Sequence, residues 1–264
     1  MKLEVLFKKY KTDKLTHNYH TIYDKYLSKL KNKKLKILEI GVSDGSSLQA
    51  WSNYFKKSAI IGIDINKPKK KKKFKKNIFF YQGSQTDKAF LKSLIKKYEK
   101  FDIIIDDGSH YPSDVIFTFK NLFDALNLNG FYFIEDTQTS YNHFFGGNPF
   151  DLKYANTHVN YFKSLCDSLN YKEIANPFYK KSKFDGFIKN ISFYNNMIAV
   201  EKNYNNNDSN LLLDNSYENK RYITKIGRSN TKIRYFLKYK VIFRLYTYLY
   251  LFFNLIKRLI LFRF

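Results

Sequence analysis

Two apolar runs of this chain end in acidic side chains. The first run ends in Asp106 and Asp107, and His110 follows three residues after the second aspartate. The other run ends in Glu135 and Asp136. If both runs are adjacent strands of a parallel sheet, they lie about 4.8 Å apart and end at the same edge. The carboxylates would then meet, and such a cluster raises its own pKa values unless a cation neutralises it.

A hard divalent cation suits this cluster. Mg²⁺ takes oxygen ligands at about 2.0–2.1 Å and commonly keeps positions for water or substrate oxygens. We predict that Asp107, Glu135 and Asp136 bind Mg²⁺, and that a sugar diol fills the remaining positions. His110, with an ordinary imidazole pKa near 6.5, is predicted to remove the proton of the reacting hydroxyl. The simpler alternative is that these acids, and the SHYPSD segment after them, cap turns and a helix.

A glycine turn follows an earlier apolar run, in the segment LEIGVSDGSS. Glu39, Gly41 and Gly45 form an E-x-G-x-x-x-G pattern where a strand is expected to turn into a helix. Glycines let the backbone turn tightly and approach a ligand, and the first N–H groups of the helix are unpaired. A dinucleotide-binding turn normally reads G-x-G-x-x-G, but Ser43 stands at its second glycine position. We therefore expect this turn, Ser43 included, to bind a cofactor that lacks phosphates.

Three further strand ends complete the predicted cofactor site. Asp64 ends the second predicted strand, about 20 residues after the glycine turn, where an acid can accept both hydroxyls of a ribose. Ser84 and Gln85 follow the third strand and are placed to flank an adenine, and Asp106 ends the fourth. A single acid at a strand end is more often a cap. The order of all these features resembles the S-adenosylmethionine site of a class I methyltransferase.

The apolar runs alternate with amphipathic segments, which predicts a βα architecture. Near-continuous apolar strands imply a parallel sheet that is covered on both faces. We expect strands over 35–42, 59–65, 77–83, 101–108 and 130–137, helices over 87–100 and 113–127, and a closing antiparallel hairpin over 186–203. The fold class is α/β, a doubly wound, Rossmann-like, mostly parallel sheet. We expect a helical N-terminal cap (1–34), the methyltransferase core (35–203), a polar linker (204–231) and a basic, aromatic, amphipathic helical tail (232–264).

The charge of the chain is extreme: its 264 residues carry a formal net charge of +24, concentrated in the Lys67–Asn77 run and in the tail. This charge predicts an anionic partner, or reflects a lysine-rich proteome. The uncharged stretch Leu245–Ile256 is too short to cross a bilayer, which needs about 20 apolar residues. We expect the tail to contact a membrane surface, or to pack on the core or in a homo-oligomer; nucleic acid is less favoured. One cysteine, Cys166, and no leader-like start indicate the cytoplasm.

The motifs together resemble a known family, the metal-dependent sugar O-methyltransferases of the macrocin and mycinamicin type. The resemblance rests on KYKTDKLTHNYHTIYDKYL, ILEIGVSDGSSLQAW, GIDI, GSQTDKAFL, IIIDDGSH and GFYFIEDTQTSY, and it covers about Tyr10–Asn203. It implies S-adenosylmethionine and Mg²⁺ as cofactors, with His110 as the general base and the metal ligands predicted above. It also implies that four residues help to close the cofactor or substrate pocket: Thr12, Asp13, Lys14 and His17.

The function that the resemblance implies is an S-adenosylmethionine- and Mg²⁺-dependent O-methyltransferase. The acceptor would be a sugar hydroxyl of a surface glycan or of another glycosylated metabolite. The loop Gln138–Phe150, with a glycine pair and several aromatics, is either a sugar-binding lid or an ordinary connection. The net charge keeps an RNA-modifying methyltransferase open as an alternative. A non-catalytic membrane or assembly module is a third, although a scaffold gains nothing from clustered buried charge.

Overall fold

The computed structural model of the chain describes residues 2–68, 74–174, 178–205, 216–217, 220–221, 245, 248–250, 252–254 and 256. The chain divides into two compact units, Met1–Leu169 with Gly186–Asn205, and Asn170–Asp185 with Asn206–Phe264. All of the predicted site residues belong to the first unit. Most of the predicted linker and tail, and the centre of the lysine run, lie outside the described residues. The domain boundaries given above therefore stay predictions.

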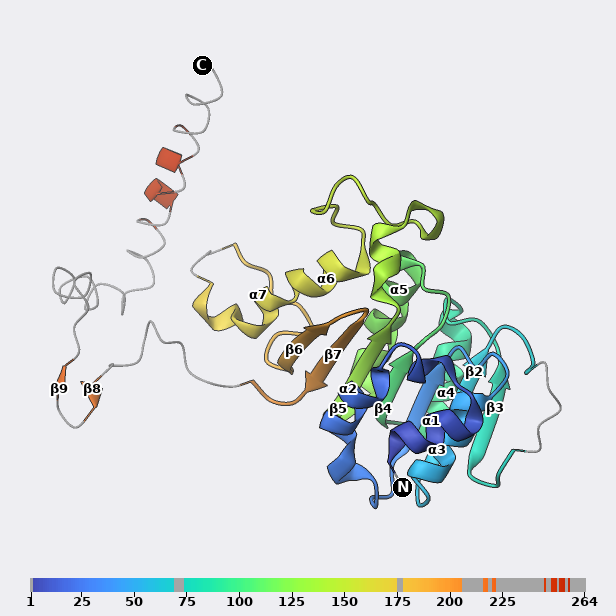
Figure 1. The fold of residues 1–264 in the computed structure, drawn as a ribbon. Helices are drawn as coiled ribbons and strands as arrows, with labels where there is room; N and C mark the ends of the chain where they lie inside the picture. The colour runs from blue at the N-terminus through green and yellow to red at the C-terminus, as the bar shows by residue number, and fades with distance from the viewer. Residues whose placement is uncertain are drawn as a thin grey trace. The chain divides into compact units, whose positions relative to one another are not determined.

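A seven-stranded sheet forms the centre of the first unit, with the strand order β3-β2-β1-β4-β5-β7-β6 (Figure 1). The first five strands along the chain run parallel to one another, and β7 runs antiparallel to both β5 and β6. The predicted doubly wound sheet with a closing hairpin is thus confirmed. Its strands are β1 (Lys36–Ile40), β2 (Ala59–Asp64), β3 (Ile78–Gln82), β4 (Phe101–Asp106), β5 (Leu126–Glu135), β6 (Ile188–Tyr194) and β7 (Met197–Lys202).

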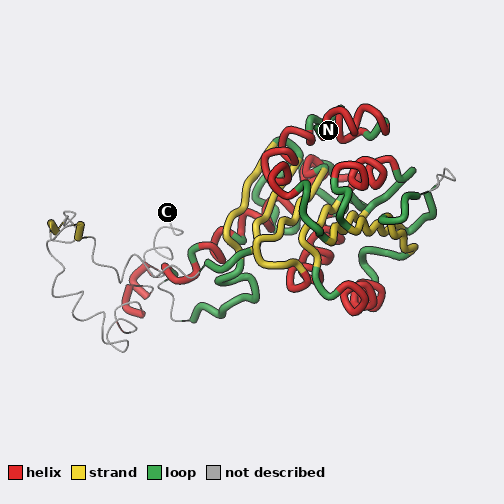
Figure 2. Tube along the Cα trace, turned by 90° about the horizontal axis from the view of Figure 1, so that it is seen from below, coloured by secondary structure: helices red, strands yellow, loops and turns green. Residues whose placement is uncertain are grey.

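Helices cover both faces of this sheet (Figure 2). One face carries α1 (Leu3–Tyr10), α2 (Tyr19–Leu27) and α3 (Ser46–Tyr54), whose buried side chains share one core cluster with β1, β2 and β4. The other face carries α4 (Lys88–Tyr98), α5 (Pro112–Leu122) and α6 (His158–Ser164), which pack against one another in that order. The short elements of this unit are η1 (Asp13–Leu15), η2 (Ser28–Leu30), η3 (Phe123–Ala125), η4 (Thr137–Tyr141), η5 (His143–Phe145) and α7 (Cys166–Leu169).

The second unit contributes short elements only among its described residues. These are η6 (Tyr171–Glu173), the paired strands β8 (Ser216–Tyr217) and β9 (Lys220–Arg221), and helical residues between 245 and 256. Within the part of the chain that the structure describes, no helix combines the length and the apolar character that crossing a bilayer requires.

Local signals explain where the helices of the second face begin. Asp87 precedes α4, and its carboxylate accepts hydrogen bonds from the backbone N–H groups of Ala89 and Phe90, as a helix N-cap does. Pro112 occupies the first turn of α5, where its missing N–H costs nothing. The predicted helix over 113–127 is too long, because α5 ends at Leu122 and β5 begins at Leu126. The strand extends to this point through an irregular pairing with β4, which a sequence periodicity does not reveal.

The strand order reverses between β1 and β4, and this topology determines where the site lies. The connections after β1 and β4 leave in opposite directions there, which opens a crevice at the carboxyl edge of the sheet. Gly41, directly after β1, has φ +83°, and a Cβ atom at this position would lie 1.8 Å from the carbonyl oxygen of Asp107. Only glycine therefore allows the two loops to approach each other so closely.

Candidate active site

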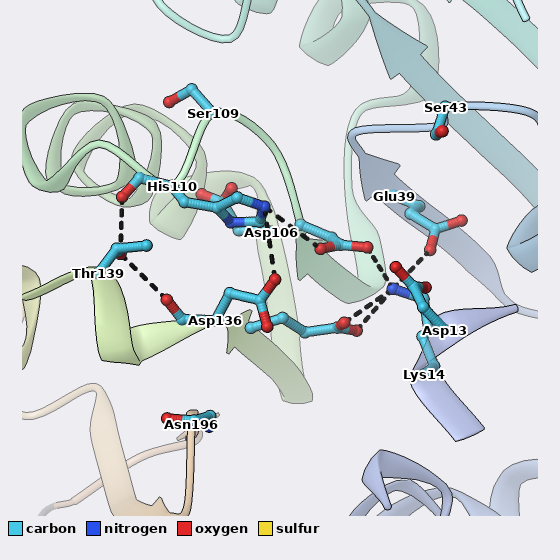
Figure 3. A network of polar contacts seen from close by, with 12 residues as sticks. Asp13, Lys14, Glu39, Ser43, Asp106, Ser109, His110, Asp136, Thr139 and Asn196 are labelled. Carbon is cyan, nitrogen blue, oxygen red and sulfur yellow. Dashed lines mark hydrogen bonds and ion pairs between the residues drawn. The ribbon is translucent and has the colours of Figure 1, made fainter. Parts of the chain in front are cut away.

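Lys14 is the centre of a buried charge cluster at the carboxyl edge of the sheet (Figure 3). Its side chain is 1% exposed, and its Nζ donates hydrogen bonds to Asp107 Oδ2 and, at 2.8 Å, to both carboxylate oxygens of Glu135. Glu39 Oε1 lies 3.4 Å from the same ammonium. The short η1 turn that carries Lys14 thus joins the ends of β1, β4 and β5. The resemblance had implied only that Lys14 helps to close a pocket.

The electrostatics of this cluster depend on Lys14. Burial alone would lower the pKa of Lys14, but the three surrounding carboxylates outweigh burial and raise its pKa well above the ordinary value. Burial raises the pKa values of Asp107 and Glu135, and the Lys14 ammonium counteracts that rise at both groups. An ammonium and several carboxylates stabilise one another's charged forms here because little water reaches them.

Two tyrosines of α2 hold the acids that end β5. Tyr23 donates its hydroxyl hydrogen bond to Glu135 Oε1 and is fully buried. Tyr19, four residues earlier on the same helix face, lies with its hydroxyl 2.7 Å from Asp136 Oδ1 and 3.0 Å from the carbonyl oxygen of Asn196. Neither tyrosine was predicted from the sequence to belong to the site. The i, i+4 spacing of the two tyrosines is the sequence signal that places both on one face of the helix. A buried tyrosine hydroxyl on that face needs a polar partner, and the acids at the strand end provide one.

Asp107, His110 and Asp136 form a second group beside the Lys14 cluster. Each offers one ligand atom, and these atoms all lie within 4.8 Å of one another. His110 Nε2 is 3.9 Å from Asp107 Oδ1 and 3.5 Å from Asp136 Oδ2. Asp107 therefore serves both groups, with Oδ2 toward Lys14 and Oδ1 toward His110. Two carboxylate oxygens that border an open pocket are the hard ligands that Mg²⁺ prefers, so the residues fit a magnesium ion.

Glu135 is placed differently from the other two predicted metal ligands. It is 2% exposed, and both of its carboxylate oxygens accept hydrogen bonds from Lys14. Glu135 does not belong to the group formed by Asp107, His110 and Asp136. Its role as a metal ligand stays a prediction. In this structure the carboxylate compensates the charge of Lys14.

Two adjoining pockets open beside these groups and share Gly41, Asp64 and Gly108. The first has a volume of about 310 Å³ and is lined by apolar strand ends together with Ser84, Gln85 and Ser109, among others. The second has a volume of about 480 Å³ and is mostly polar. Its lining includes Thr12, Asp13, Lys14, Ser43, Asp107, His110 and Asp136. The structure therefore gathers residues from the ends of β1, β2, β3, β4 and β5 around one continuous space.

Some predicted cofactor residues lie behind the pockets rather than in their lining. Glu39 is fully buried below the glycine turn, and its carboxylate accepts hydrogen bonds from Ser47 Oγ and Trp51 Nε1. Gly45 faces the ring of Phe74, and His17 is exposed and stacks on Tyr19. Direct contact of these residues with a cofactor stays a prediction. The lining residues that were not predicted as site residues are Lys11, Ile40, Val42, Asp44, Ser46, Ser47, Ile63, Ile65, Asn66, Gly83, Gly108, Ser109 and Asp114.

Asp106 is buried behind the first pocket and belongs to a polar network. Tyr132 donates to its Oδ2 at 3.2 Å, and Gln85 Nε2 donates to its Oδ1 at 3.3 Å. Burial raises the pKa of Asp106 to about 7, although these donors and a backbone N–H favour the charged form. Gln85 also accepts a hydrogen bond from the backbone N–H of Ser109 at 2.8 Å. The network thus holds the loop that carries His110.

A second histidine lies behind the loop after β5 and supports it. His158 is fully buried, its Nε2 is 3.3 Å from the carbonyl oxygen of Thr137, and its Nδ1 has no hydrogen-bond partner among the described residues. Burial lowers the pKa of His158 from 6.5 to about 4. The folded protein therefore keeps this imidazole neutral where the unfolded chain would protonate it.

The pH dependence of stability should reveal this histidine. Because the unfolded chain binds the extra proton, the contribution of His158 is complete above pH 6.5 and is lost as the pH falls toward 4, by about 3 kcal/mol in the free energy of unfolding. Urea unfolding at pH 8 and at pH 5 should show about 2 kcal/mol of this loss. The His158→Leu variant should lose this part of the pH dependence, and the exposed-site control His143→Gln should keep it. Equal pH dependence in all three proteins would contradict the assignment.

Curated relatives of this chain are sugar O-methyltransferases, whereas none of the protein-family models matches it. The mycinamicin VI 2''-O-methyltransferase of Micromonospora griseorubida is 32% identical over 197 residues, which are 72% of this chain and 49% of that protein. The demethylmacrocin O-methyltransferase of Streptomyces fradiae is 32% identical over the same shares of each chain. The chain thus spans about half the length of the curated relatives it matches.

Solved structures agree with these relatives. The methyltransferase MycE of the mycinamycin biosynthetic pathway, in complex with Mg and SAH, superposes with a TM-score of 0.77 at 30% identity, covering 88% of this chain and 60% of that chain. A further MycE complex, which also contains mycinamycin VI, gives a TM-score of 0.70 at 32% identity, covering 78% and 56%. Sequence identity and superposition therefore agree, and the chain is a member of the class I methyltransferase family to which these sugar O-methyltransferases belong.

Proposed function

We propose that this chain transfers the methyl group of S-adenosylmethionine to a sugar hydroxyl, with Mg²⁺ bound at the carboxyl edge of the sheet. The observation that carries this proposal is the group of Asp107, His110 and Asp136 beside the two adjoining pockets. The MycE structures, which contain Mg and SAH, support the choice of cofactors. The names of the relatives support the sugar acceptor.

The cofactor is proposed to lie along the two pockets. Asp64 Oδ2 accepts hydrogen bonds from the backbone N–H groups of Val42 at 2.8 Å and Ser43 at 3.0 Å, which hold this carboxylate at the junction of the pockets. An acid held there is placed to accept the hydroxyls of a ribose. The apolar first pocket, with Ser84 beside it, suits an adenine, and the polar second pocket suits the charged amino-acid part.

The residues of this chain are proposed to position the acceptor hydroxyl and to remove its proton. When bound, Mg²⁺ would supply a Lewis acid that makes an acceptor hydroxyl more acidic. His110 Nε2 faces the carboxylates of Asp107 and Asp136 and takes the hydroxyl proton. The acceptor oxygen forms its bond to the methyl carbon while the bond from that carbon to sulfur breaks, so S-adenosylhomocysteine leaves. The Lys14 ammonium favours the charged form of Asp107.

The acceptor is proposed to be a sugar attached to a large apolar group. Tyr111 follows His110 directly, is 44% exposed and contacts Phe145, with the two rings tilted by 48° and their centroids 5.6 Å apart. The adjoining loop exposes Phe144 (76%), Phe150 (95%) and Leu152 (63%). Exposed apolar side chains that gather beside a site indicate a binding surface. This supports the sugar-binding lid predicted for this loop, with an apolar aglycone on its aromatic side chains.

The comparisons favour this acceptor over the other candidates. The relatives named above are O-methyltransferases named for mycinamicin VI and demethylmacrocin, and two relatives from Streptomyces olivaceus are named for rhamnosyl tetracenomycin-C. They support neither a surface polysaccharide nor RNA as the acceptor. The RNA-modifying alternative rests on net charge alone, and a non-catalytic module would not need the cluster of buried acids around Lys14.

Contact of the region 232–264 with an anionic membrane is kept as a separate proposal, together with a cytoplasmic location. Its support is the basic sequence and the exposure of described side chains such as Tyr250 (60%) and Phe253 (65%). Co-sedimentation of the full chain with vesicles of anionic or of neutral lipid tests it. Equal recovery with both vesicle types would contradict the proposal. A homo-oligomer stays open, and gel filtration measures it.

Calorimetric titration of the full chain with S-adenosylmethionine and with Mg²⁺ tests the proposed function. The wild type should bind both. Asp107→Asn should lose at least about 10-fold in Mg²⁺ affinity and retain the cofactor, because a neutral amide is a weaker ligand for Mg²⁺. Asp64→Asn should lose about 10- to 100-fold in cofactor affinity and retain Mg²⁺, because charge-assisted hydrogen bonds are lost.

The control for both variants is Asp167→Asn, which removes an exposed carboxylate away from the pockets and should bind both ligands as the wild type does. Binding of the cofactor without any Mg²⁺ affinity would reject the metal-dependent mechanism. Absence of cofactor binding by the wild type would reject the methyltransferase proposal as a whole.

A further inference from the structure

Thr139, on the η4 turn after β5, joins the two loops that carry the candidate base and a candidate metal ligand. Its Oγ1 lies 2.8 Å from the carbonyl oxygen of His110 and 3.0 Å from that of Asp136, so its single O–H hydrogen is shared between the two carbonyl oxygens (Figure 3). The side chain is 4% exposed, so water competes little for this hydroxyl. One side chain thus connects the loop after β4 to the loop after β5, 29 residues apart in sequence.

Both residues that Thr139 holds have a strained backbone. His110 has φ 60° and Asp136 has φ 55°. Both values lie in the left-handed region of the backbone, which residues other than glycine rarely adopt. Such a conformation is maintained only where the surrounding contacts over-determine it. The hydroxyl of Thr139 lies against the carbonyl oxygen of both strained residues. Ser109, the residue before His110, is held by other contacts. Its backbone N–H donates to the side-chain oxygen of Gln85, and its hydroxyl donates to Asp114 Oδ2 at 2.7 Å.

We propose that Thr139 is a positioning residue for the methyl transfer, because its hydroxyl holds the left-handed backbones of His110 and Asp136 in one arrangement. Without it, the two loops lose a hydrogen bond to the main chain of His110, next to the 3.5 Å approach of His110 Nε2 to Asp136 Oδ2. Thr139 touches neither the predicted ion nor the acceptor. Its influence passes through the main chain to the base and to the ligand. The inference rests on the proposed function.

The test compares Thr139→Val, which keeps the shape and removes the hydroxyl, with Thr139→Ser, which keeps the hydroxyl. Thr137→Val is the matched control, since Thr137 is also a buried threonine on η4 and, among the described residues, its hydroxyl has no hydrogen bond that joins the two loops. Thr139→Val should lower kcat about 10- to 100-fold and weaken Mg²⁺ affinity several-fold, with the KM for S-adenosylmethionine unchanged. Thr139→Ser and Thr137→Val should remain within about 3-fold of the wild type.

A readout that does not depend on activity separates this inference from the proposed function. Amide hydrogen exchange over the peptide 107–112 should be about 10-fold faster in Thr139→Val than in the wild type, and unchanged in Thr139→Ser. Wild-type exchange and kcat in Thr139→Val would overturn the positioning role. Equal losses in Thr139→Ser and Thr139→Val would assign the effect to packing of the methyl group and also overturn it. A wild type without methyl transfer, but with faster exchange in Thr139→Val, would reject the proposed function alone.

Discussion

His110→Ala is expected to lower kcat by about 10²- to 10⁴-fold while binding of S-adenosylmethionine and Mg²⁺ persists. The expectation follows from the position of Nε2, which lies 3.5 Å from Asp136 Oδ2 and 3.9 Å from Asp107 Oδ1 and borders the polar pocket. A base in this position meets a hydroxyl that lies against the two carboxylates. Removing the imidazole leaves water to accept the proton.

Steady-state kinetics and calorimetry on the same preparation measure this effect. Added imidazole should restore part of the lost kcat. The structure allows a second role, because His110 Nε2 also belongs to the group of atoms that could hold a metal ion. A loss of Mg²⁺ affinity of more than about 10-fold in His110→Ala would assign the imidazole to the ion and reject its role as the base.

Lys14→Met is expected to lower the free energy of unfolding by about 3–5 kcal/mol at neutral pH. Lys14 is the shared partner of Asp107 and Glu135, and it lies 3.4 Å from Glu39. Removing the ammonium leaves these buried carboxylates to repel one another without compensation. They must then either remain charged or take up protons, and both cost free energy at pH 7. Chemical denaturation of the wild type and the variant measures the difference.

A double variant and a matched lysine test the cause of this loss. Lys14→Met combined with Glu135→Gln should be more stable than Lys14→Met alone, because one uncompensated charge is removed. Lys202→Met should lose less, about 1–3 kcal/mol, because the buried Lys202 ammonium donates hydrogen bonds to backbone carbonyl oxygens such as those of Phe123 and Leu126.

The loss of stability in Lys14→Met should also depend on pH, and the direction of this dependence tests whether charge is the cause. In Lys14→Met the carboxylates of Asp107 and Glu135 lose the charge that lowered their pKa values, so the folded variant binds protons more readily than the unfolded chain. The deficit relative to the wild type should therefore shrink as the pH falls toward 5. A deficit that does not change between pH 8 and pH 5 would mean that lost packing of the lysine side chain, and not charge, is responsible.

Much of the fold and the location of the site could be predicted from the sequence. Apolar runs that each end in a polar residue predicted parallel strands, and parallel strands in one sheet place their carboxyl ends at one edge. Asp64, Asp107 and Asp136 therefore had to lie close together, and the two pockets confirm that they line one space. The length of α5 was overestimated because the irregular pairing at the start of β5 leaves no periodic signal.

The partners of the acids could not be predicted from the sequence. Lys14 meets Asp107 across 93 residues and Glu135 across 121 residues, and no local pattern specifies contacts of that range. The sequence by itself determined that several carboxylates would gather at one edge, because strand ends and parallel pairing depend on local composition and period. Only the tertiary structure decided that Glu135 faces Lys14 while Asp107 Oδ1 and Asp136 face His110, because packing of the N-terminal helices against the sheet sets each carboxylate's direction.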